Sequence, residues 1–283
     1  MRCLFTADLH GHRGRYQALR KLIEKETPAG LFIGGDLFRA DRVSEEFIKA
    51  ELFEPIVRMR KESGKTIRCF IIMGNDDPRG LEETFQKADA DGIIDYVHNR
   101  AVPFGDLFVT GYSFVPPTPF QLKDWEKYDV SRFVDPGCVS PEEGYRSVPV
   151  PAREIRYSTI ADDLDRLAHN APPNKTIYLF HSPPYKTCLD RAALDGKMID
   201  FAPLDVHVGS IAIERFIRQH QPLLSLHGHI HESTRLTGQW SEKIGQTVAC
   251  NGSCEGDQLA IVRFDPHNLG SLTREVISLC PRN

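Results

Sequence analysis

Short apolar runs alternate with amphipathic stretches along most of the chain, a pattern typical of an α/β protein. The apolar runs predict strands at residues 2–7, 30–33, 67–73, 93–97, 107–110, 176–180, 223–226, 247–249, 259–264 and 272–277. Apolar residues at helical spacing predict helices at residues 15–25, 47–57, 81–88, 155–167 and 210–218. The early strands are almost continuously apolar, so we expect them to be buried on both faces.

The alternation breaks between about Tyr112 and Arg153. This segment holds seven of the 19 prolines and many of the aromatic residues. Such a long segment without regular structure is unusual inside a compact domain and is often functional when it is ordered. Three interpretations stay open: a loop that covers a sheet edge, a cap that shapes a substrate site, or an oligomer contact. We expect a single domain over residues 1–283 with residues 112–153 as an irregular insertion.

Composition and charge narrow the class of protein. Hydrophobic residues make up 41% and charged residues 26%, and the formal net charge is −4, which argues against a general nucleic-acid coat or a polybasic membrane anchor. No apolar run approaches the ~18 residues of a membrane-spanning helix, and no charged leader precedes a long apolar stretch. The seven cysteines are odd in number and form no disulfide framework, so a reducing, cytoplasmic location is expected.

Polar residues follow five of the predicted strands, at the point where each strand ends. In α/β sheets, ligands gather at the carboxyl ends of the strands, so these residues are expected to share one rim. The five groups are Asp8 with His10, Asp36, Asn75 with Asp76, His181, and His229 with His231.

The spacing within these groups fits metal binding. Asp8 and His10, like His229 and His231, are two residues apart, so on extended backbone their side chains point to the same side. The glycines beside them allow a sharp exit from the strand and a close backbone approach. Mixed carboxylate and imidazole ligands suit Mn, Fe or Zn better than calcium, with Ni or Mg as further candidates.

The order Asp8-x-His10, Gly35-Asp36, Gly74-Asn75-Asp76, His181, Gly228-His229-x-His231 resembles that of the calcineurin-like metallophosphoesterases, and among them the prokaryotic Icc-related phosphoesterases. The resemblance covers residues 1 to about 255 and implies a four-layer αββα sandwich of two mixed sheets flanked by helices. It also implies two divalent metal ions. Asp8, His10 and His231 would bind the first ion, Asp36 would bridge, and Asn75, His181 and His229 would bind the second.

The implied charge suits a small phosphate-ester substrate. Two divalent ions carry four positive charges, of which Asp8 and Asp36 offset two, so the centre would attract an anionic phosphate. Paired ions also make hydroxide available at neutral pH and stabilise an in-line displacement at phosphorus. The implied reaction is therefore attack of metal-bound hydroxide on a phosphate ester.

One position departs from the family pattern. The residue after Asn75 is usually a histidine that assists catalysis, and here it is Asp76. Cations nearby would keep Asp76 ionised, so it would donate a proton poorly and repel a dianionic monoester. This favours phosphodiesters or nucleotides as substrates. His12 is a second catalytic candidate, either contacting the phosphate or replacing the missing proton donor, and an exposed loop histidine is an equal alternative.

Other residues have simpler interpretations. Asp77 precedes Pro78 and is expected to cap a helix, because aspartate before proline favours a helix start. The arginines that follow the motifs, Arg13, Arg39 and Arg79, are candidate phosphate clamps, although arginines at such positions are usually solvated at the surface.

A nuclease, a non-catalytic protein-binding scaffold and a protein phosphatase are alternative functions. No ligand position is lost, which disfavours the scaffold, and the net charge makes nucleic acid an unlikely partner. A homo-oligomer stays open.

Overall fold

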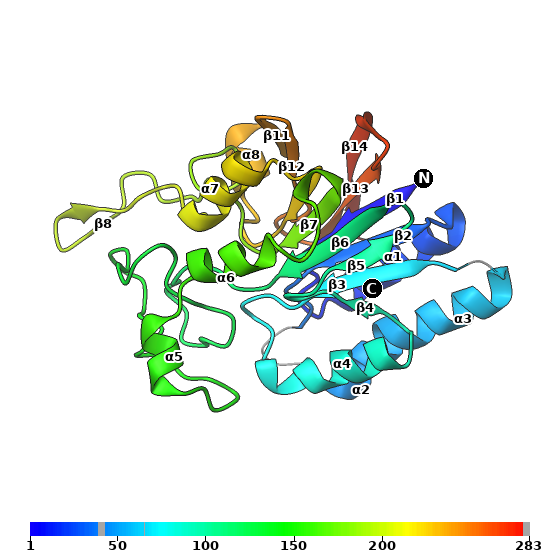
Figure 1. The fold of residues 1–283 in the computed structure, drawn as a ribbon, viewed down its shortest axis with the longest axis horizontal. Helices are drawn as coiled ribbons and strands as arrows, with labels where there is room; N and C mark the ends of the chain where they lie inside the picture. Colours follow the sequence, from blue (N-terminus) through cyan, green and yellow to red (C-terminus); the bar gives the residue numbers. More distant parts are fainter. Residues whose placement is uncertain (39–42, 65, 280–283) are drawn as a thin grey trace.

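The computed structural model describes residues 1–38, 43–64 and 66–279, which form two facing mixed sheets with helices on their outer sides (Figure 1). In the described residues, one six-stranded sheet has the order β14-β13-β1-β2-β3-β4 and the other has the order β11-β12-β10-β7-β6-β5. The strands β1, β2 and β3 are parallel neighbours, as are β7 and β10. The predicted helix-sheet-sheet-helix architecture is confirmed.

The strands are β1 (Cys3–Thr6), β2 (Gly30–Gly34), β3 (Arg68–Ile72), β4 (Asp95–Tyr96), β5 (Val102–Phe104), β6 (Leu107–Tyr112), β7 (Thr176–Phe180), β8 (Met198–Ile199), β9 (Ala202–Pro203), β10 (Leu224–His227), β11 (Ser241–Ile244), β12 (Thr247–Asn251), β13 (Gln258–Asp265) and β14 (Asn268–Ser278). The helices are α1 (Arg13–Glu26), α2 (Glu45–Ile48), α3 (Glu54–Ser63), α4 (Glu82–Ala90), α5 (Ala152–Tyr157), α6 (Ile160–Leu167), α7 (Ile211–His220) and α8 (Ser233–Thr237).

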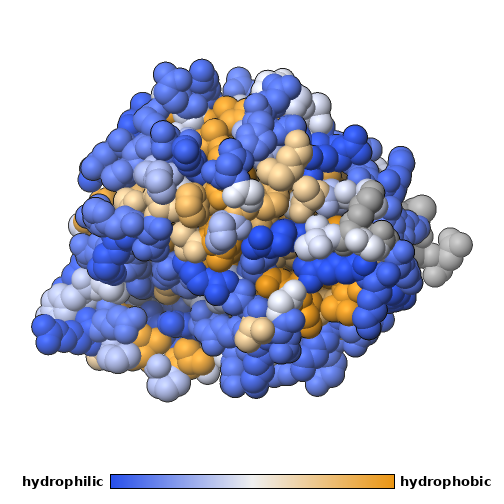
Figure 2. Space-filling view, turned by 45° about the vertical axis from the view of Figure 1, so that its right-hand side comes forward, coloured by the Kyte–Doolittle hydropathy of each residue, from blue (hydrophilic) through white to orange (hydrophobic). Residues whose placement is uncertain are grey.

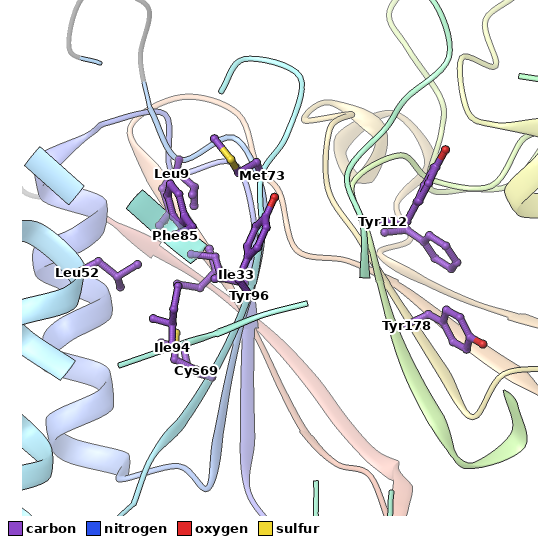
Figure 3. Packing of buried hydrophobic residues seen from close by; sticks show 14 of the residues in the cluster. Leu9, Ile33, Leu52, Cys69, Met73, Phe85, Ile94, Tyr96, Tyr112 and Tyr178 are labelled. Carbon is purple, nitrogen blue, oxygen red and sulfur yellow. The ribbon is translucent and has the colours of Figure 1, made fainter. Parts of the chain in front are cut away.

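Alternate residues of the central strands serve two different cores. Phe5 and Phe32 point into the layer between the sheets, where they meet Ile177 and Leu226 of the opposite sheet. Their neighbours in sequence, such as Ile33, face the helices on the outer side. Figure 3 shows this outer layer, with Ile33 near Leu52 and Phe85 on one side of the molecule and Tyr112 and Tyr178 on the other sheet. The strands are thus buried on both faces, as their continuous apolar character predicts.

Several element predictions differ from the structure. The helix expected at 155–167 is two helices, because Thr159 adopts an extended conformation and its side chain caps α6 by accepting from the Asp162 N–H. The helix expected at 47–57 contains a π-helical turn over Lys49–Phe53, which ends two residues before Pro55, a residue with no N–H to donate. The strand expected at 93–97 is reduced to the two residues of β4.

The short strands β5, β8, β9 and β11 and the single-turn helix α8 were not predicted. Each has five residues or fewer. Segments this short carry too few residues to display a period of 2.0 or 3.6, so periodicity gives no signal for them.

The insertion is irregular over residues 113–151, because Tyr112 still belongs to β6 and α5 starts at Ala152. Buried side chains attach it to the rest of the molecule. Trp125 is fully buried and packs against His98 of the neighbouring sheet edge. The Asp129 carboxylate accepts hydrogen bonds from the N–H groups of Ile211 and Ala212 at the start of α7.

The surface of the insertion also exposes large aromatic side chains, namely Phe120, Phe133 and Tyr145. The cap and oligomer-contact interpretations therefore both remain predictions. On the face shown in Figure 2, apolar patches are interrupted by hydrophilic residues. Within the part of the chain that the structure describes, no helix is both long and apolar enough to cross a membrane.

Candidate metal centre

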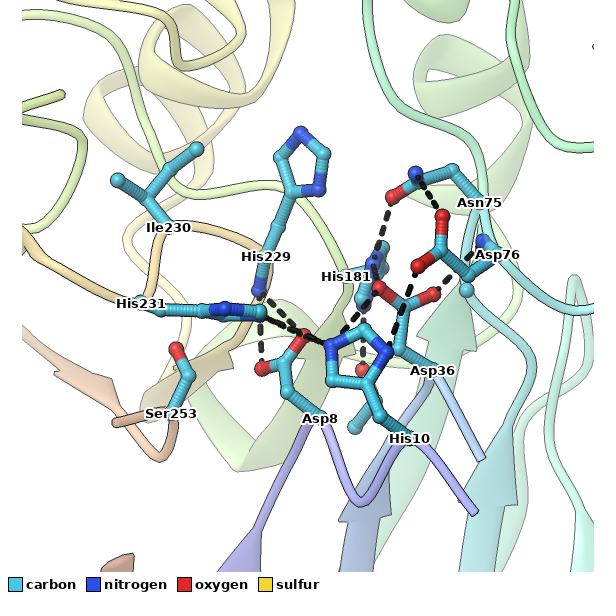
Figure 4. A network of polar contacts seen from close by, with 12 residues as sticks. Asp8, His10, Asp36, Asn75, Asp76, His181, His229, Ile230, His231 and Ser253 are labelled. Atoms are coloured by element: carbon cyan, nitrogen blue, oxygen red, sulfur yellow. Dashed lines mark hydrogen bonds and ion pairs between the residues drawn. The ribbon is translucent and has the colours of Figure 1, made fainter. Parts of the chain in front are cut away.

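The carboxyl ends of five strands converge where the two sheets meet (Figure 4). One sheet contributes the loops that follow β1, β2 and β3, and the other contributes the loops that follow β7 and β10. The Asp8 carboxylate accepts a hydrogen bond from the His229 N–H at 3.1 Å, which ties the two sheets together at the site. The seven candidate ligands are thus brought to one place by the ends of parallel strands.

Two groups of donor atoms share one residue. Asp8, His10, Asp36 and His231 each offer an atom to a first group, and Asp36, His181 and His229 form a second group, with the atoms of each group within 4.8 Å of one another. Asp36 is common to both groups, which is the arrangement that a bridging carboxylate requires. The bridging role that the family resemblance implies for Asp36 stays a prediction.

Asn75 faces His181, a member of the second group. The Asn75 Oδ1 lies 3.0 Å from His181 Nε2, and Asp36 Oδ2 lies 3.3 Å from the same nitrogen. The other ring nitrogen, Nδ1, lies 2.7 Å from the Gly34 carbonyl oxygen and can donate to it. That hydrogen bond would leave Nε2 of His181 as the nitrogen available to a metal ion.

The backbone at the site is held in an uncommon conformation. Asp8, His10, Asp36 and His229 all have positive φ, between 44° and 71°. Non-glycine residues adopt this left-handed region in only a few per cent of cases, and such residues cluster at functional sites. Gly74 makes the geometry feasible, since a Cβ there would collide with the Asp36 carboxylate.

The electrostatics of the centre favour a cation. Asp8 and Asp36 are almost fully buried, and in the described part of the chain neither carboxylate pairs with a lysine or arginine. Burial raises the pKa of Asp36, but the imidazoles of His181 and His10 outweigh it and hold that pKa below its ordinary value. Burial lowers the pKa of His10, but the Asp76, Asp36 and Asp8 carboxylates outweigh it and raise the pKa to about 9.

The same donor set fits divalent ions. The buried carboxylates raise the pKa of His10 and of His181, so protons on these two imidazoles compensate the carboxylates in the metal-free protein. Metal ions would replace those protons on binding. His10 Nε2 and His231 Nε2 face each other at 3.0 Å, beside Asp8. Oxygen and imidazole nitrogen donors without thiolate are ligands that Mn, Fe and Zn accept.

Arg15 supports the centre and was missed in the sequence. Its buried guanidinium donates to the main-chain carbonyl of Asp8 and to those of Gly256 and Gln258. It thereby connects the loop after β1 to the start of β13. The only signal in the sequence is a charged residue on the apolar face of the predicted helix, at the same spacing as Leu19 and Leu22.

The candidate residues outside the seven ligands differ in how near they lie to the centre. Asp76 lies at the centre, beside His10 and Asn75. His12 directly precedes α1, and its Nε2 lies 3.5 Å from Asp257. It belongs to neither donor group. Arg13 pairs with Glu51, Arg79 pairs with Glu82, and Arg39 lies outside the described residues.

Asp77 is not a helix cap, contrary to prediction. Its buried carboxylate accepts hydrogen bonds from the N–H groups of Leu37, Phe38 and Gly74, at 2.8 to 2.9 Å. The short helical turn after it has Pro78 at the capping position. Asp77 therefore joins the loop after β2 to the loop after β3, a contact between residues 40 apart that local sequence cannot indicate.

Solved structures share this fold at low sequence identity. One crystal structure has a TM-score of 0.60 at 15% identity, with 98% of this chain and 99% of that chain covered. The protein TT1561 of Thermus thermophilus has a TM-score of 0.58 at 16% identity, with 98% of both chains covered. At these identities the likeness shows the fold alone.

The family is shown by a sequence match. The family model Metallophos, calcineurin-like phosphoesterase, matches residues 1–233, which include all seven candidate ligands. The chain therefore belongs to the calcineurin-like phosphoesterase family. No curated protein matches the chain.

Proposed function

We propose that this protein is a dinuclear-metal-dependent phosphoesterase that hydrolyses phosphate esters, with phosphodiesters or nucleotides as preferred substrates. The observation that carries the proposal is the shared position of Asp36 in two adjacent donor groups. Two divalent ions held there, with Mn, Fe or Zn as the best matched, would polarise a phosphoryl oxygen and supply a nucleophile at neutral pH.

The candidate ligands fall into two sets, one for each metal ion. Asp8, His10 and His231 would hold one ion and Asn75, His181 and His229 the other, while Asp36 contacts both. The buried carboxylates carry fewer negative charges than two divalent ions carry positive ones, so the occupied centre would bind a phosphate anion. His10, His229 and His231 are partly exposed, whereas Asp8, Asp36 and His181 are buried, so the substrate would approach from the imidazole side.

The preference for diesters is inferred from Asp76. Its side chain is 43% exposed and lies at the same rim as His10. A carboxylate at this position would repel a dianionic monoester more than a monoanionic diester. A cytoplasmic location is part of the proposal, and it is supported by the absence of a disulfide among the six described cysteines.

A substrate panel tests the proposed function. Metal-free protein is loaded separately with Mn, Fe, Zn, Ni or Mg and assayed on matched phosphomonoesters and phosphodiesters, with metal content measured in parallel. Metal-dependent hydrolysis of at least one diester, abolished by a chelator and restored by metal, is the expected result. Protein that holds two equivalents of metal and hydrolyses neither class would overturn the proposal.

Asp76→His is expected to raise monoesterase relative to diesterase activity. The substitution removes a negative charge where charge develops in the transition state, and it adds a proton donor, an effect typically worth about 10²–10⁴-fold. The gain should be largest for an alkyl leaving group, which needs protonation most. The measurement is kcat/KM for one alkyl monoester and one matched diester at equal metal occupancy. An unchanged or lower monoester-to-diester ratio would mean that Asp76 does not set the substrate class.

A further inference from the structure

Asp76 contacts three of the candidate ligands at once. Its Oδ2 lies 3.4 Å from His10 Nδ1, and its Oδ1 accepts a hydrogen bond from the Asn75 Nδ2 at 3.2 Å. Its main-chain N–H donates to Asp36 Oδ1 at 2.9 Å. Figure 4 shows the Asp76 side chain between His10 and Asn75, which come from loops after different strands. Within the described residues, its ion pair is with His10.

The contact with His10 determines which ring nitrogen faces the centre. With Nδ1 directed at Asp76, the opposite nitrogen, Nε2, lies 3.0 Å from His231 Nε2 and within 4 Å of Asp36. Histidines that ligate metals commonly donate their other N–H to a carboxylate, which fixes the tautomer and the ring orientation. His181 obtains the same constraint from the Gly34 carbonyl, and His10 obtains it from Asp76.

The contact with Asn75 determines which end of the carboxamide faces the centre. Because Asp76 accepts from Nδ2, the oxygen Oδ1 points towards His181 Nε2. Carboxamide oxygen is the atom that can ligate a cation, whereas the NH₂ group cannot. One carboxylate therefore orients one member of each half of the centre.

We infer that Asp76 is a positioning residue, which orients His10 and Asn75 for the two metal ions. The inference rests on the proposed dinuclear function, because it concerns ligands of that centre. It assigns Asp76 a role in metal affinity that is separate from any effect of its charge on the substrate. The two roles predict different results for variants of the same position.

The test compares Asp76→Asn with Asp76→Ala. The asparagine keeps one oxygen that can accept from His10 Nδ1–H, while both variants lose the charge. Metal-free wild type and variants are titrated calorimetrically with Zn²⁺ and, separately, with Mn²⁺. We expect Asp76→Ala to weaken binding by about 10–100-fold, as removal of outer hydrogen-bond partners does. Asp76→Asn should fall between Asp76→Ala and wild type, because its oxygen can keep the contact with His10 whereas its NH₂ group cannot accept from Asn75.

A spectroscopic signature supplements the affinities. In zinc-loaded protein, the His10 Nδ1–H signal should persist in wild type and Asp76→Asn, and should weaken through faster solvent exchange in Asp76→Ala. The matched control is Asp195→Ala, which removes an exposed carboxylate paired with Arg191 outside the centre and should leave binding unchanged.

The outcomes separate the positioning role from its alternatives. Equal loss of affinity in Asp76→Asn and Asp76→Ala would overturn positioning in favour of charge alone, and no loss in either would overturn both. Wild-type protein that binds two equivalents of metal yet hydrolyses no ester would refute the proposed function. In that case the affinities of the variants would still decide the role of Asp76.

Discussion

Replacing Asp36 with asparagine is expected to abolish tight binding of the metal pair and to lower phosphoesterase activity about a thousandfold or more, equivalent to about 4 kcal/mol. Asp36 belongs to both donor groups, so its loss affects both ions, whereas any other ligand belongs to one. The fold should survive, because asparagine has the same size and its Oδ1 can still accept from the Asp76 N–H.

The measurement is metal content after dialysis against metal-free buffer, together with the rate on the best substrate and the melting temperature with a chelator present. The matched control is Asp190→Asn, because Asp190 is a fully buried aspartate that pairs with His207 away from the centre. That variant should lose stability and keep two equivalents of metal. Retention of both equivalents and of the rate in Asp36→Asn would show that Asp36 does not bridge.

The grouping of the candidate site residues could be predicted from the sequence, because the carboxyl ends of parallel strands lie at one edge of a sheet. The residues Asp8, Asp36 and Asn75 each follow an apolar run, and so does His181. A strand pattern and a rule about strand ends were enough to bring them together. The left-handed backbone at Asp8 and Asp36 was not readable, since it is imposed by contacts across the site, such as the close approach of Gly74.

The contacts of Arg15 and Asp77 that support the site could not be predicted from the sequence, for a different reason. Arg15 bonds to carbonyls at positions 8, 256 and 258, and Asp77 bonds to N–H groups at 37, 38 and 74. Both side chains bind main-chain groups, which every residue has. The identity of the partner residues therefore gives no sign of either set of contacts. The Asp77 prediction failed for this reason, because a local rule for helix caps was applied to a residue whose partners are distant.

The buried contacts of the insertion, residues 113–151, also could not be predicted from local sequence. Its prolines and aromatics indicated irregular structure, and residues 113–151 are irregular. Its buried ion pair was not foreseen. Lys123 and Glu126 have no exposed side-chain surface, and Lys123 Nζ lies 2.6 Å from Glu126 Oε2. Lysine and glutamate three residues apart are usually read as a solvated helix face, so only the fold reveals that this pair is internal.

Lys123→Met is expected to destabilise the protein by about 3–5 kcal/mol, because removing one partner of a buried ion pair leaves an uncompensated charge. The carboxylate of Glu126 would keep only the Thr118 N–H and hydroxyl as partners. Burial already raises the pKa of Glu126 above its ordinary value with the ammonium of Lys123 beside it. For a chain of this size, the loss corresponds to a fall in melting temperature of roughly 6–20 °C.

Two further variants make this prediction specific to the buried pair. Lys87→Met removes the lysine of an exposed pair with Glu83, whose side chains are 70% and 73% exposed, and should change the stability far less, because solvent screens such a pair. The double variant Lys123→Met/Glu126→Gln removes both charges while leaving an oxygen for Thr118, so it should regain much of the lost stability. Hydrogen exchange of metal-free protein should locate the loss of protection in residues 113–151. Equal, small effects of Lys123→Met and Lys87→Met would mean that the insertion is held by its other contacts, such as Trp125 against His98 and Asp129 at the start of α7.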